Sequence, residues 1–266
     1  NDCIAQHLWG ERAMKQVQQG ATLIVVLILL VVITVLGTLA IRQSMVTLNI
    51  ATNSQAMQLM LQNADSAFFN VEKQSNIVQA LSGSGMFGYI DGATNKDKEL
   101  VFCYRGADQK KFFDLSNASI VEWNAPATKP KNNSLGKDGF CKVSDNSFNF
   151  FTSGRKAVMT QVAVKFATEA SNDPFYGQVL GTDGNTVKLE RSKPVKVFAI
   201  SIMPSLTSAD KAEIDKCLSE HMNDVTIPSG VTAAAGANKS VTQCLSDLNV
   251  PFESTVTEYV ITQDFV

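Results

Sequence analysis

The strongest hydrophobic run of this chain lies near its N-terminus. Residues 21–41 read ATLIVVLILLVVITVLGTLAI and contain no charged side chain. A helix rises about 1.5 Å per residue, so the run is long enough to cross a hydrocarbon core of about 30 Å. A secretory signal peptide normally has a shorter apolar region of about 7–15 residues and then a small-residue cleavage site. The pattern therefore predicts a membrane-spanning helix over residues 21–42.

The helical pattern continues after Arg42 with a different distribution of apolar side chains. Through residues 43–82 they recur at intervals of three, four and seven, as at Met57, Met60, Ala64 and Phe68. This spacing gives an amphipathic helix with one apolar face, which we expect to be core rather than a ligand groove. No proline interrupts the run. We expect one helix of about 60 residues, roughly 90 Å long.

The pattern beyond residue 85 favours short strands around a helical insertion. Strands are predicted at Glu99–Arg105, Lys111–Leu115, Ser119–Trp123, Ser147–Thr152, Ala157–Ala167, Thr186–Glu190, Val195–Met203 and Phe252–Val266. Helices are predicted at Ala209–His221, with Ser208 as N-cap, and at Ser240–Leu248. Residues 205–251 would then be an insertion between two strands of one sheet. The predicted fold class is α+β: a long N-terminal helix packed on an antiparallel β-sheet, with a small helical insertion.

Composition and candidate chemistry argue against an enzyme. The 266 residues carry a formal net charge of -2, which gives no electrostatic footprint for nucleic acid. The chain has two histidines, His7 and His221, whereas zinc enzymes need clustered ligands and Ser or Cys hydrolases need a His base. The turn at residues 183–185 lacks the alternating oxygen ligands of a calcium loop. We expect no catalytic residue, no metal site and no cofactor.

The five cysteines divide around the apolar run. Cys3 precedes it, and Cys103, Cys141, Cys217 and Cys244 follow it without any CxxC spacing. If the run delivers these four across a membrane, two disulfides are expected, and three connectivities are possible. We favour Cys103–Cys141 and Cys217–Cys244, because each pair closes a loop within one region.

The start of the apolar run resembles a known processing site. Gln18-Gln19-Gly20-Ala21-Thr22-Leu23-Ile24 is similar to the prepilin peptidase site of the type IV pilin superfamily, where a short basic leader ends in Gly. The resemblance implies cleavage between Gly20 and Ala21 and N-methylation of Ala21. It also implies that residues 1–20 hold the leader, starting at Met14. We expect residues 1–13 to be an upstream extension that is not native, and residues 43–266 to form a periplasmic pilin-like domain.

One position departs from the superfamily pattern. Most pilins carry Glu at the fifth mature position, which is Val25 here. In the family that carboxylate pairs with the N-terminal ammonium of a neighbouring subunit, and a lone charge in a low-dielectric filament core would be costly. In lacking this Glu, the chain resembles the minor pilins that are located at filament tips.

Within the superfamily the chain resembles the minor pilin PilX group. The likeness rests on residues 19–24, on Ala40-Ile41-Arg42 and on residues 62–68, where Asp65 stands in place of the group's usual Glu. It implies a structural subunit of a type IV pilus, at or near the tip, that acts in initiation of pilus assembly or in adhesion and twitching motility. The implied partners are other minor pilins, the major pilin, a large tip adhesin and the prepilin peptidase. The implied location is the bacterial inner membrane, with the domain in the periplasm, and then the extracellular pilus.

Three alternatives stay open. The tip pseudopilin of a type II secretion system also lacks the Glu that Val25 replaces. A single-pass periplasmic sensor or binding module would keep residues 1–20 and need no processing. An anchored enzyme is disfavoured, because His221 is the only histidine after the apolar run and no nucleophile motif accompanies it.

Overall fold

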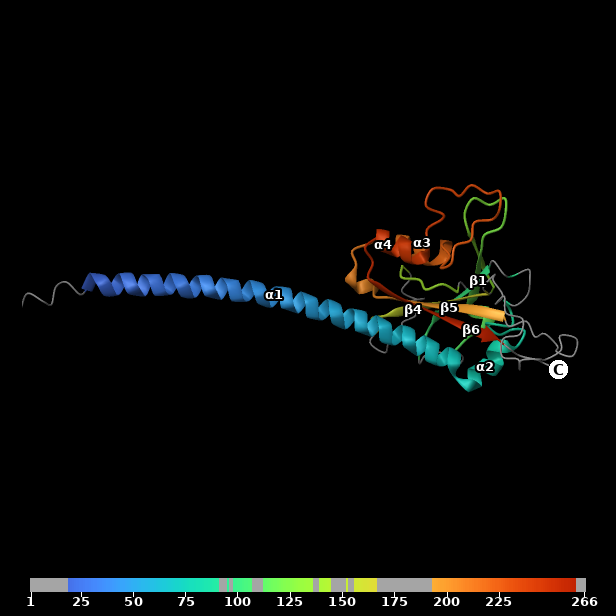
Figure 1. The fold of residues 1–266 in the computed structure, drawn as a ribbon, viewed down its shortest axis with the longest axis horizontal. Coiled ribbons are helices and arrows are strands. Elements are labelled where there is room, and N and C mark those ends of the chain that lie inside the picture. The colour runs from blue at the N-terminus through green and yellow to red at the C-terminus, as the bar shows by residue number, and fades with distance from the viewer. Residues whose placement is uncertain are drawn as a thin grey trace, which may run out of the picture. The chain divides into compact units, whose positions relative to one another are not determined.

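The computed structural model describes residues 19–90, 95, 98–106, 112–135, 139–144, 152, 156–166 and 193–261 (Figure 1). The chain divides into two compact units, Asn1–Gln55 and Ala56–Val266. Some predicted features lie outside the described residues: residues 1–18 with Cys3 and His7, the strand at 186–190, and all of the strand at 147–152 except Thr152.

A long N-terminal helix is confirmed. Helix α1 runs from Gln19 to Glu72, 54 residues without a break. It is shorter than the predicted helix because Lys73 adopts an extended conformation, and the chain continues as α2, Gln74–Leu81. The Asn76 side-chain amide donates a hydrogen bond of 2.8 Å to the backbone oxygen of Asn70 and so satisfies a carbonyl in the last turn of α1. The sequence pattern alone does not reveal this cap.

Six antiparallel strands form one sheet in the order β3-β2-β1-β4-β5-β6, and the α+β class is confirmed. The strands are β1 Lys98–Tyr104, β2 Ala118–Glu122, β3 Lys131–Ser134, β4 Met159–Phe166, β5 Lys193–Ile202 and β6 Phe252–Ile261. The strand predicted at Lys111–Leu115 is wrong for its described residues, because Leu115 begins a short 3-10 helix, η2, Leu115–Asn117. Asp114 stabilises that turn by accepting the Ser116 backbone N–H.

The two faces of the sheet pack against different parts of the chain, because successive side chains of a strand point to opposite faces. The α1 face packs on residues 64–71 of α1 and includes Leu100, Phe102, Val162, Val164, Val195 and Val197. The opposite face, called the insertion face here, includes Val101, Cys103, Met159, Ala163, Phe198 and Ile200. Residues 203–251 cover much of this second face, so the central strands β1, β4 and β5 are largely buried on both sides.

The segment between β5 and β6 contains a short 3-10 helix, η3, Pro204–Leu206, followed by α3, Lys211–Glu220, and α4, Val241–Asp247. The predicted N-cap of α3, Ser208, is wrong: Asp210 caps the helix and accepts the Ala212 backbone N–H at 3.0 Å. Helix α4 begins where expected, with a capping box in which Ser240 and Gln243 each accept the other's backbone N–H.

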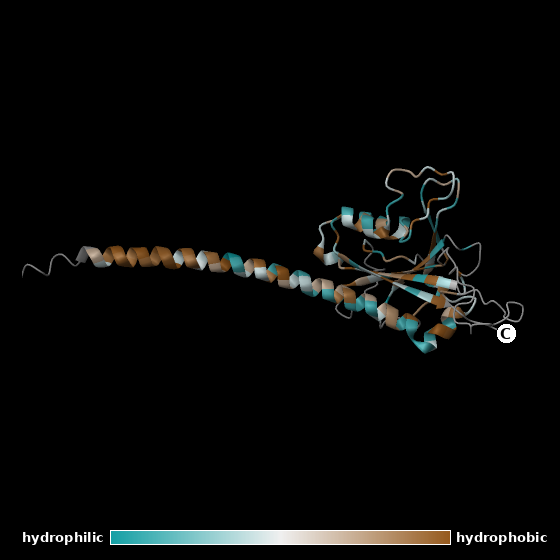
Figure 2. Ribbon diagram, viewed as in Figure 1, coloured by the Kyte–Doolittle hydropathy of each residue, from teal (hydrophilic) through white to brown (hydrophobic). Residues whose placement is uncertain are grey.

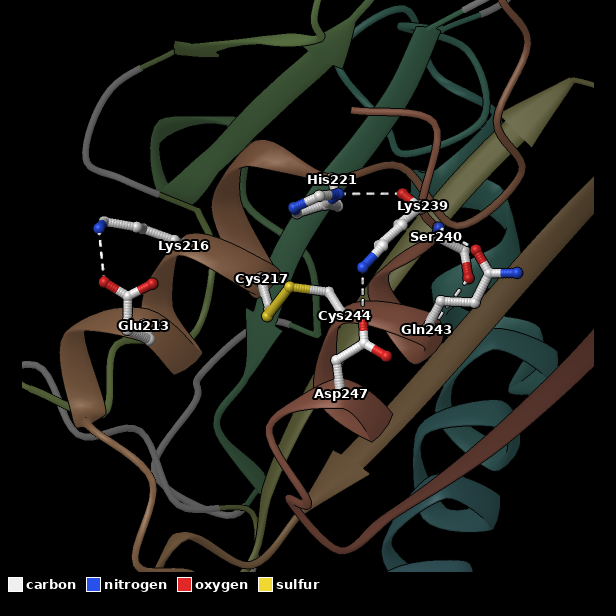
Figure 3. The surroundings of a disulfide bond; sticks show 9 residues. All are labelled: Glu213, Lys216, Cys217, His221, Lys239, Ser240, Gln243, Cys244 and Asp247. Carbon is white, nitrogen blue, oxygen red and sulfur yellow. Dashed lines mark hydrogen bonds and ion pairs between the residues drawn. A yellow bond between two sulfur atoms is a disulfide. The ribbon is translucent and has the colours of Figure 1, made fainter. Parts of the chain in front are cut away.

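The structure contains the disulfides Cys103–Cys141 and Cys217–Cys244, with Cα–Cα distances of 4.9 and 5.5 Å. These are the pairs that the sequence analysis favoured. The second bridge joins α3 to α4 (Figure 3). Beneath it lies a buried cluster that links both helices to the insertion face, formed by Ile200, Ile214, Leu218, Val241 and Leu245.

Candidate functional site

Helix α1 exposes a long apolar surface over residues 23–50. Every large hydrophobic side chain in this stretch is 48–70% exposed. Figure 2 shows the first part of α1 as hydrophobic on almost every turn. Over residues 23–41 such a helix has no polar face to present to water, so it needs lipid or other helices around it. This segment is the candidate functional site.

The threonine hydroxyls within the segment bond to the helix's own backbone. The hydroxyls of Thr34 and Thr38 each donate a 2.8 Å hydrogen bond, to the backbone oxygens of Val31 and Val35. A helix satisfies its own interior backbone groups, so this segment meets the main requirement for entering a hydrocarbon core. By length and composition, one helix in the described part of the chain can cross a membrane, and it is this one.

The predicted processing residues lie at the start of this helix. Gly20 and Ala21 are the second and third residues of α1. Val25 lies one turn further on, with its side chain 56% exposed. Arg42 is the first charged residue of the helix. Residue 25 is therefore apolar in a helix whose first 23 residues carry no charge, and cleavage after Gly20 stays a prediction.

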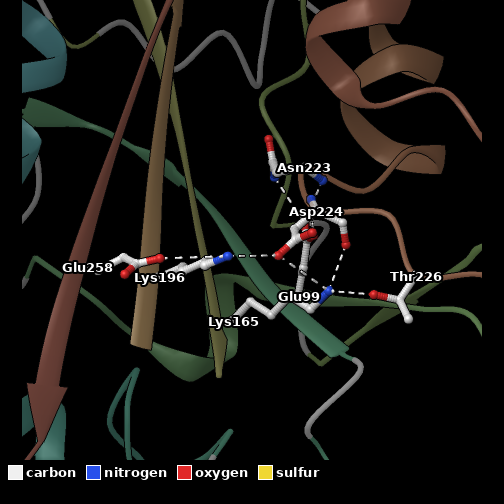
Figure 4. Close-up of polar contacts among 7 residues, drawn as sticks. All are labelled: Glu99, Lys165, Lys196, Asn223, Asp224, Thr226 and Glu258. Carbon is white, nitrogen blue, oxygen red and sulfur yellow. Dashed lines mark hydrogen bonds and ion pairs between the residues drawn. The ribbon is translucent and has the colours of Figure 1, made fainter. Parts of the chain in front are cut away.

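A second polar arrangement, which the sequence analysis missed, lies on the insertion face of the sheet (Figure 4). The Glu99 side chain on β1 is fully buried. Its carboxylate accepts the backbone N–H groups of Asn223 and Asp224 at 2.9 and 2.8 Å, and the Asn223 side-chain amide at 2.9 Å. Burial raises the pKa of Glu99, while these hydrogen bonds and the positive charge of Lys165 oppose the rise.

Two lysines complete this arrangement. Lys165 on β4 is 2% exposed, and its ammonium donates to the backbone oxygen of Asp224 at 2.6 Å and to the Thr226 hydroxyl at 3.1 Å. Lys196 on β5 lies 3.4 Å from the Asp224 carboxylate and 3.6 Å from Glu258. The group fastens residues 223–226 to three strands. A charged residue within an apolar strand, such as Glu99 in KELVFCY, was the available signal.

Other polar groups also serve the fold. His221 pairs through Nδ1 with the backbone oxygen of Lys239 at 2.9 Å, and Lys239 pairs with Asp247 at 2.5 Å (Figure 3).

A cavity of about 260 Å³ lies between α2 and residues 112–115. Among the described residues, no group of three or more His, Cys, Asp or Glu side chains is placed to hold a metal ion.

The arrangement defines a class of protein: an α+β domain, stapled by two disulfides, whose N-terminal helix has the length and composition of a membrane anchor. Residues 19–69 match the family model described as PilX N-terminal. The N-terminal region is therefore similar to that of PilX pilins, and the match supports a type IV pilus minor-pilin-like role. No curated protein and no solved structure matches the chain.

Proposed function

We propose that this chain is a non-catalytic minor pilin that lies at or near the tip of a type IV pilus and acts in initiation of pilus assembly. The observation that carries the proposal is the exposed apolar surface of α1 over residues 23–50, inside a segment that matches the PilX N-terminal model. Such a surface needs partners along its whole length, and a filament supplies them as neighbouring helices.

The proposed route begins in the inner membrane. Prepilin peptidase cuts after Gly20, and the helix from Ala21 onward stays in the bilayer until the subunit joins the filament. Moving a helix from lipid to a helix bundle gains little hydrophobic free energy, because lipid tails are as apolar as leucine. Assembly then depends on close van der Waals packing. Gly37 suits this, since a Cβ built there meets no atom within 4 Å and its bare backbone is open to a neighbour.

The residue at position 25 favours the tip over the shaft. In the superfamily the usual Glu at this position pairs with the N-terminal ammonium of an adjacent subunit. Val25 cannot make this pair. A shaft position would leave the neighbour's ammonium unpaired in an apolar core, which is costly, whereas a position beyond the last such neighbour carries no penalty.

The polar residues of the domain fit a structural role rather than a catalytic one. Glu99 and Lys165 bind the insertion to the sheet, and His221 bonds to a backbone oxygen. Two disulfides are consistent with a domain that folds in the oxidising periplasm. We propose other minor pilins, the major pilin and a large tip adhesin as its partners.

Replacement of Gly20 tests the proposal. Gly20→Leu should block cleavage, leave the leader on the membrane-bound protein, and reduce the number of filaments per cell. Gly37→Leu adds the same side chain within the same helix but leaves the junction intact, so it should still yield an Ala21 terminus; because Gly37 lies in the proposed packing surface, this variant is a control for cleavage and not for the filament count. The readouts are the mass of the N-terminal peptide, including its methyl group, and a filament count by electron microscopy. An uncleaved wild-type chain in cells with normal filaments would overturn the proposal and identify a single-pass membrane protein.

A further inference from the structure

The two edges of the sheet are protected to different degrees. Strand β3 forms one edge with four residues, and it carries Lys131 and otherwise only polar side chains. A short edge strand and an edge lysine both discourage pairing with another chain. Strand β6 forms the other edge with ten residues, which include no Lys, Arg or Pro and pair with β5 without a bulge. The sheet thus has one blunted edge and one edge that can accept a further strand.

The outer edge of β6 has no partner strand in the part of the chain that the structure describes. An edge strand presents a row of N–H and C=O groups, which water or another extended backbone can satisfy. Val256 and Val260 lie on β6, and their side chains are 49% and 59% exposed. They point to the same face, because they are four residues apart on a strand. Water would satisfy the backbone and leave both valines exposed, whereas an added strand with apolar side chains on that face would cover them.

The sequence of β6 is complementary to itself. A second copy of β6 can run antiparallel to the first with Val256 opposite its own counterpart. In this register every residue from 252 to 260 has a partner across the two copies. The pairs are Val256–Val256, Val260–Phe252, Thr255–Thr257, Glu258–Ser254 and Glu253–Tyr259.

This register is better matched than its neighbours. It covers Val256 and Val260 with apolar side chains, and it places each carboxylate opposite a residue that carries a hydroxyl. A register centred on Thr257 would instead put Val256 opposite Glu258. A register centred on Glu258 would set two carboxylates against each other, which is destabilising.

We infer that β6 pairs with β6 of a second copy of this chain, in the antiparallel register centred on Val256. The same patch is used on both copies, as a two-fold symmetric dimer requires, and the sheet continues from one domain into the other. The inference goes beyond the proposed function and does not depend on it, because the contact uses the edge of the sheet and not the apolar helix over residues 21–41.

A charge swap in the full-length chain, purified in detergent, tests the dimer. Val256→Lys would set two ammonium groups opposite each other and Val256→Glu two carboxylates, so each variant alone should dimerise at least about tenfold more weakly than the wild type. An equal mixture of the two variants should recover dimers, because Lys then faces Glu. Sedimentation measures the dimer fraction, and unchanged urea midpoints should confirm that both variants fold.

Association through the apolar helix would not respond to residue 256, so this experiment separates the two modes. A wild-type chain that stays monomeric would overturn the inference. So would a dimer that both single variants retain, or a mixture that forms no more dimer than either variant alone.

Cysteine crosslinking tests the register without a charge change. In a Cys3→Ser background, Val256→Cys should form a disulfide between two copies, because residue 256 lies opposite itself at a Cβ–Cβ distance of about 5 Å. Val260→Cys is the matched control on the same face of the same strand. Residue 260 lies opposite residue 252 of the second copy, so its own counterpart is about 27 Å away along the strand.

The crosslinked dimer should be at least about tenfold more abundant for Val256→Cys than for Val260→Cys, because a disulfide forms only over a short Cβ–Cβ distance. Equal yields at the two positions would overturn the register. In cells, capture of residue 256 by a strand of a different protein, while the purified chain stays monomeric, would give the edge to that partner and overturn the inference.

Discussion

The carboxylate of Glu99 accepts a hydrogen bond of 2.8 Å from the backbone N–H of Asp224, across a separation of 125 residues. Glu99 lies on β1 near the middle of the sheet, and Asp224 lies in the segment after α3. The bond thus fixes the insertion to the sheet independently of both disulfides. Because the carboxylate is fully buried, its protonation state is coupled to the stability of the domain.

The Glu99→Gln variant should be less stable than the wild type, and its deficit should shrink as the pH rises above about 4.5. Gln offers one acceptor oxygen and turns its NH2 group toward a backbone donor, so a buried N–H loses its partner, at about 1–3 kcal/mol. Burial raises the pKa of Glu99 above its ordinary value of 4.5. Between those two pKa values the folded state binds more protons than the unfolded state, so the stability of the wild type falls as the pH rises.

Urea unfolding at several pH values between 4 and 8 measures this effect. Glu213→Gln is the matched control, because it removes a carboxylate that is half exposed and pairs with Lys216 on the surface. Its deficit should stay within about 1 kcal/mol at every pH. A Glu99→Gln deficit that grows with pH would show that the pKa of Glu99 is lowered on folding instead.

Gly139→Ala should lower the free energy of unfolding of the domain by about 1–3 kcal/mol. A Cβ at this position would lie 2.3 Å from the Ser119 nitrogen and 2.5 Å from the Val101 oxygen, and both atoms belong to the backbone of the sheet. The strands cannot move aside without breaking their ladder. The Gly139 N–H also donates to the Ser119 hydroxyl at 2.7 Å, and this bond holds Gly139 close to β2.

Gly83→Ala is the control for this substitution, because a Cβ there meets nothing within 4 Å. Its effect on the urea midpoint should correspond to no more than about 0.5 kcal/mol. Gly139→Ala should also slow closure of the nearby Cys103–Cys141 bridge, which thiol labelling during refolding would detect. Equal stabilities of the two alanine variants would contradict the steric argument.

Removal of the Cys217–Cys244 bridge should loosen α4 before the sheet. The bridge closes a loop with a sequence separation of 27, for which chain entropy gives about 3.5 kcal/mol. Helix α4 has seven residues, and so short a helix is unstable without tertiary support. In Cys217→Ala/Cys244→Ala, amide exchange should accelerate in α4 more than in β5.

The paired variant Cys103→Ala/Cys141→Ala gives the comparison, since that loop has a similar sequence separation of 38 but ends on β1. Its loss of total stability should be similar, because the entropy of loop closure changes slowly with length. Its exchange pattern should differ, with acceleration near Cys141 instead of in α4. Identical exchange patterns in the two paired variants would contradict local stapling.

The sequence predicted the parts of this fold that repeat a pattern. Helix α1 and strands β1, β4 and β5 carry long apolar periodicities, so their approximate positions were predictable. Strand β3 was not predicted, because Lys131-Asn132-Asn133-Ser134 lacks both apolar alternation and strand propensity. It forms because it pairs with β2, as in the register Ile120–Asn133.

Features that depend on one long-range contact were also beyond the sequence. Asp210 and Ser208 are both good N-caps, and only the backbone path after η3 places Asp210 at the start of α3. Lys165 and Glu99 look like exposed strand residues unless the insertion that covers them is known. The start of the apolar helix, in contrast, was local enough to suggest Gly20 and Val25 as candidate site residues from the chain alone.

The Val25→Glu variant tests the tip assignment. Val25 is 56% exposed and lies outside the compact unit Ala56–Val266, so a Glu there should not disturb the domain. In a filament, a carboxylate at this position can pair with the N-terminal ammonium of an adjacent subunit and so removes the penalty of a buried lone charge. We therefore expect the variant to spread from filament ends into the shaft. Immunogold labelling should show the wild-type chain at filament ends, and the Val25→Glu chain both at ends and along the shaft. Val26→Glu is the control. It puts the carboxylate on a different side of the helix, so it should gain no shaft labelling. Wild-type chain labelled evenly along the shaft would contradict the tip position, even if processing after Gly20 is normal.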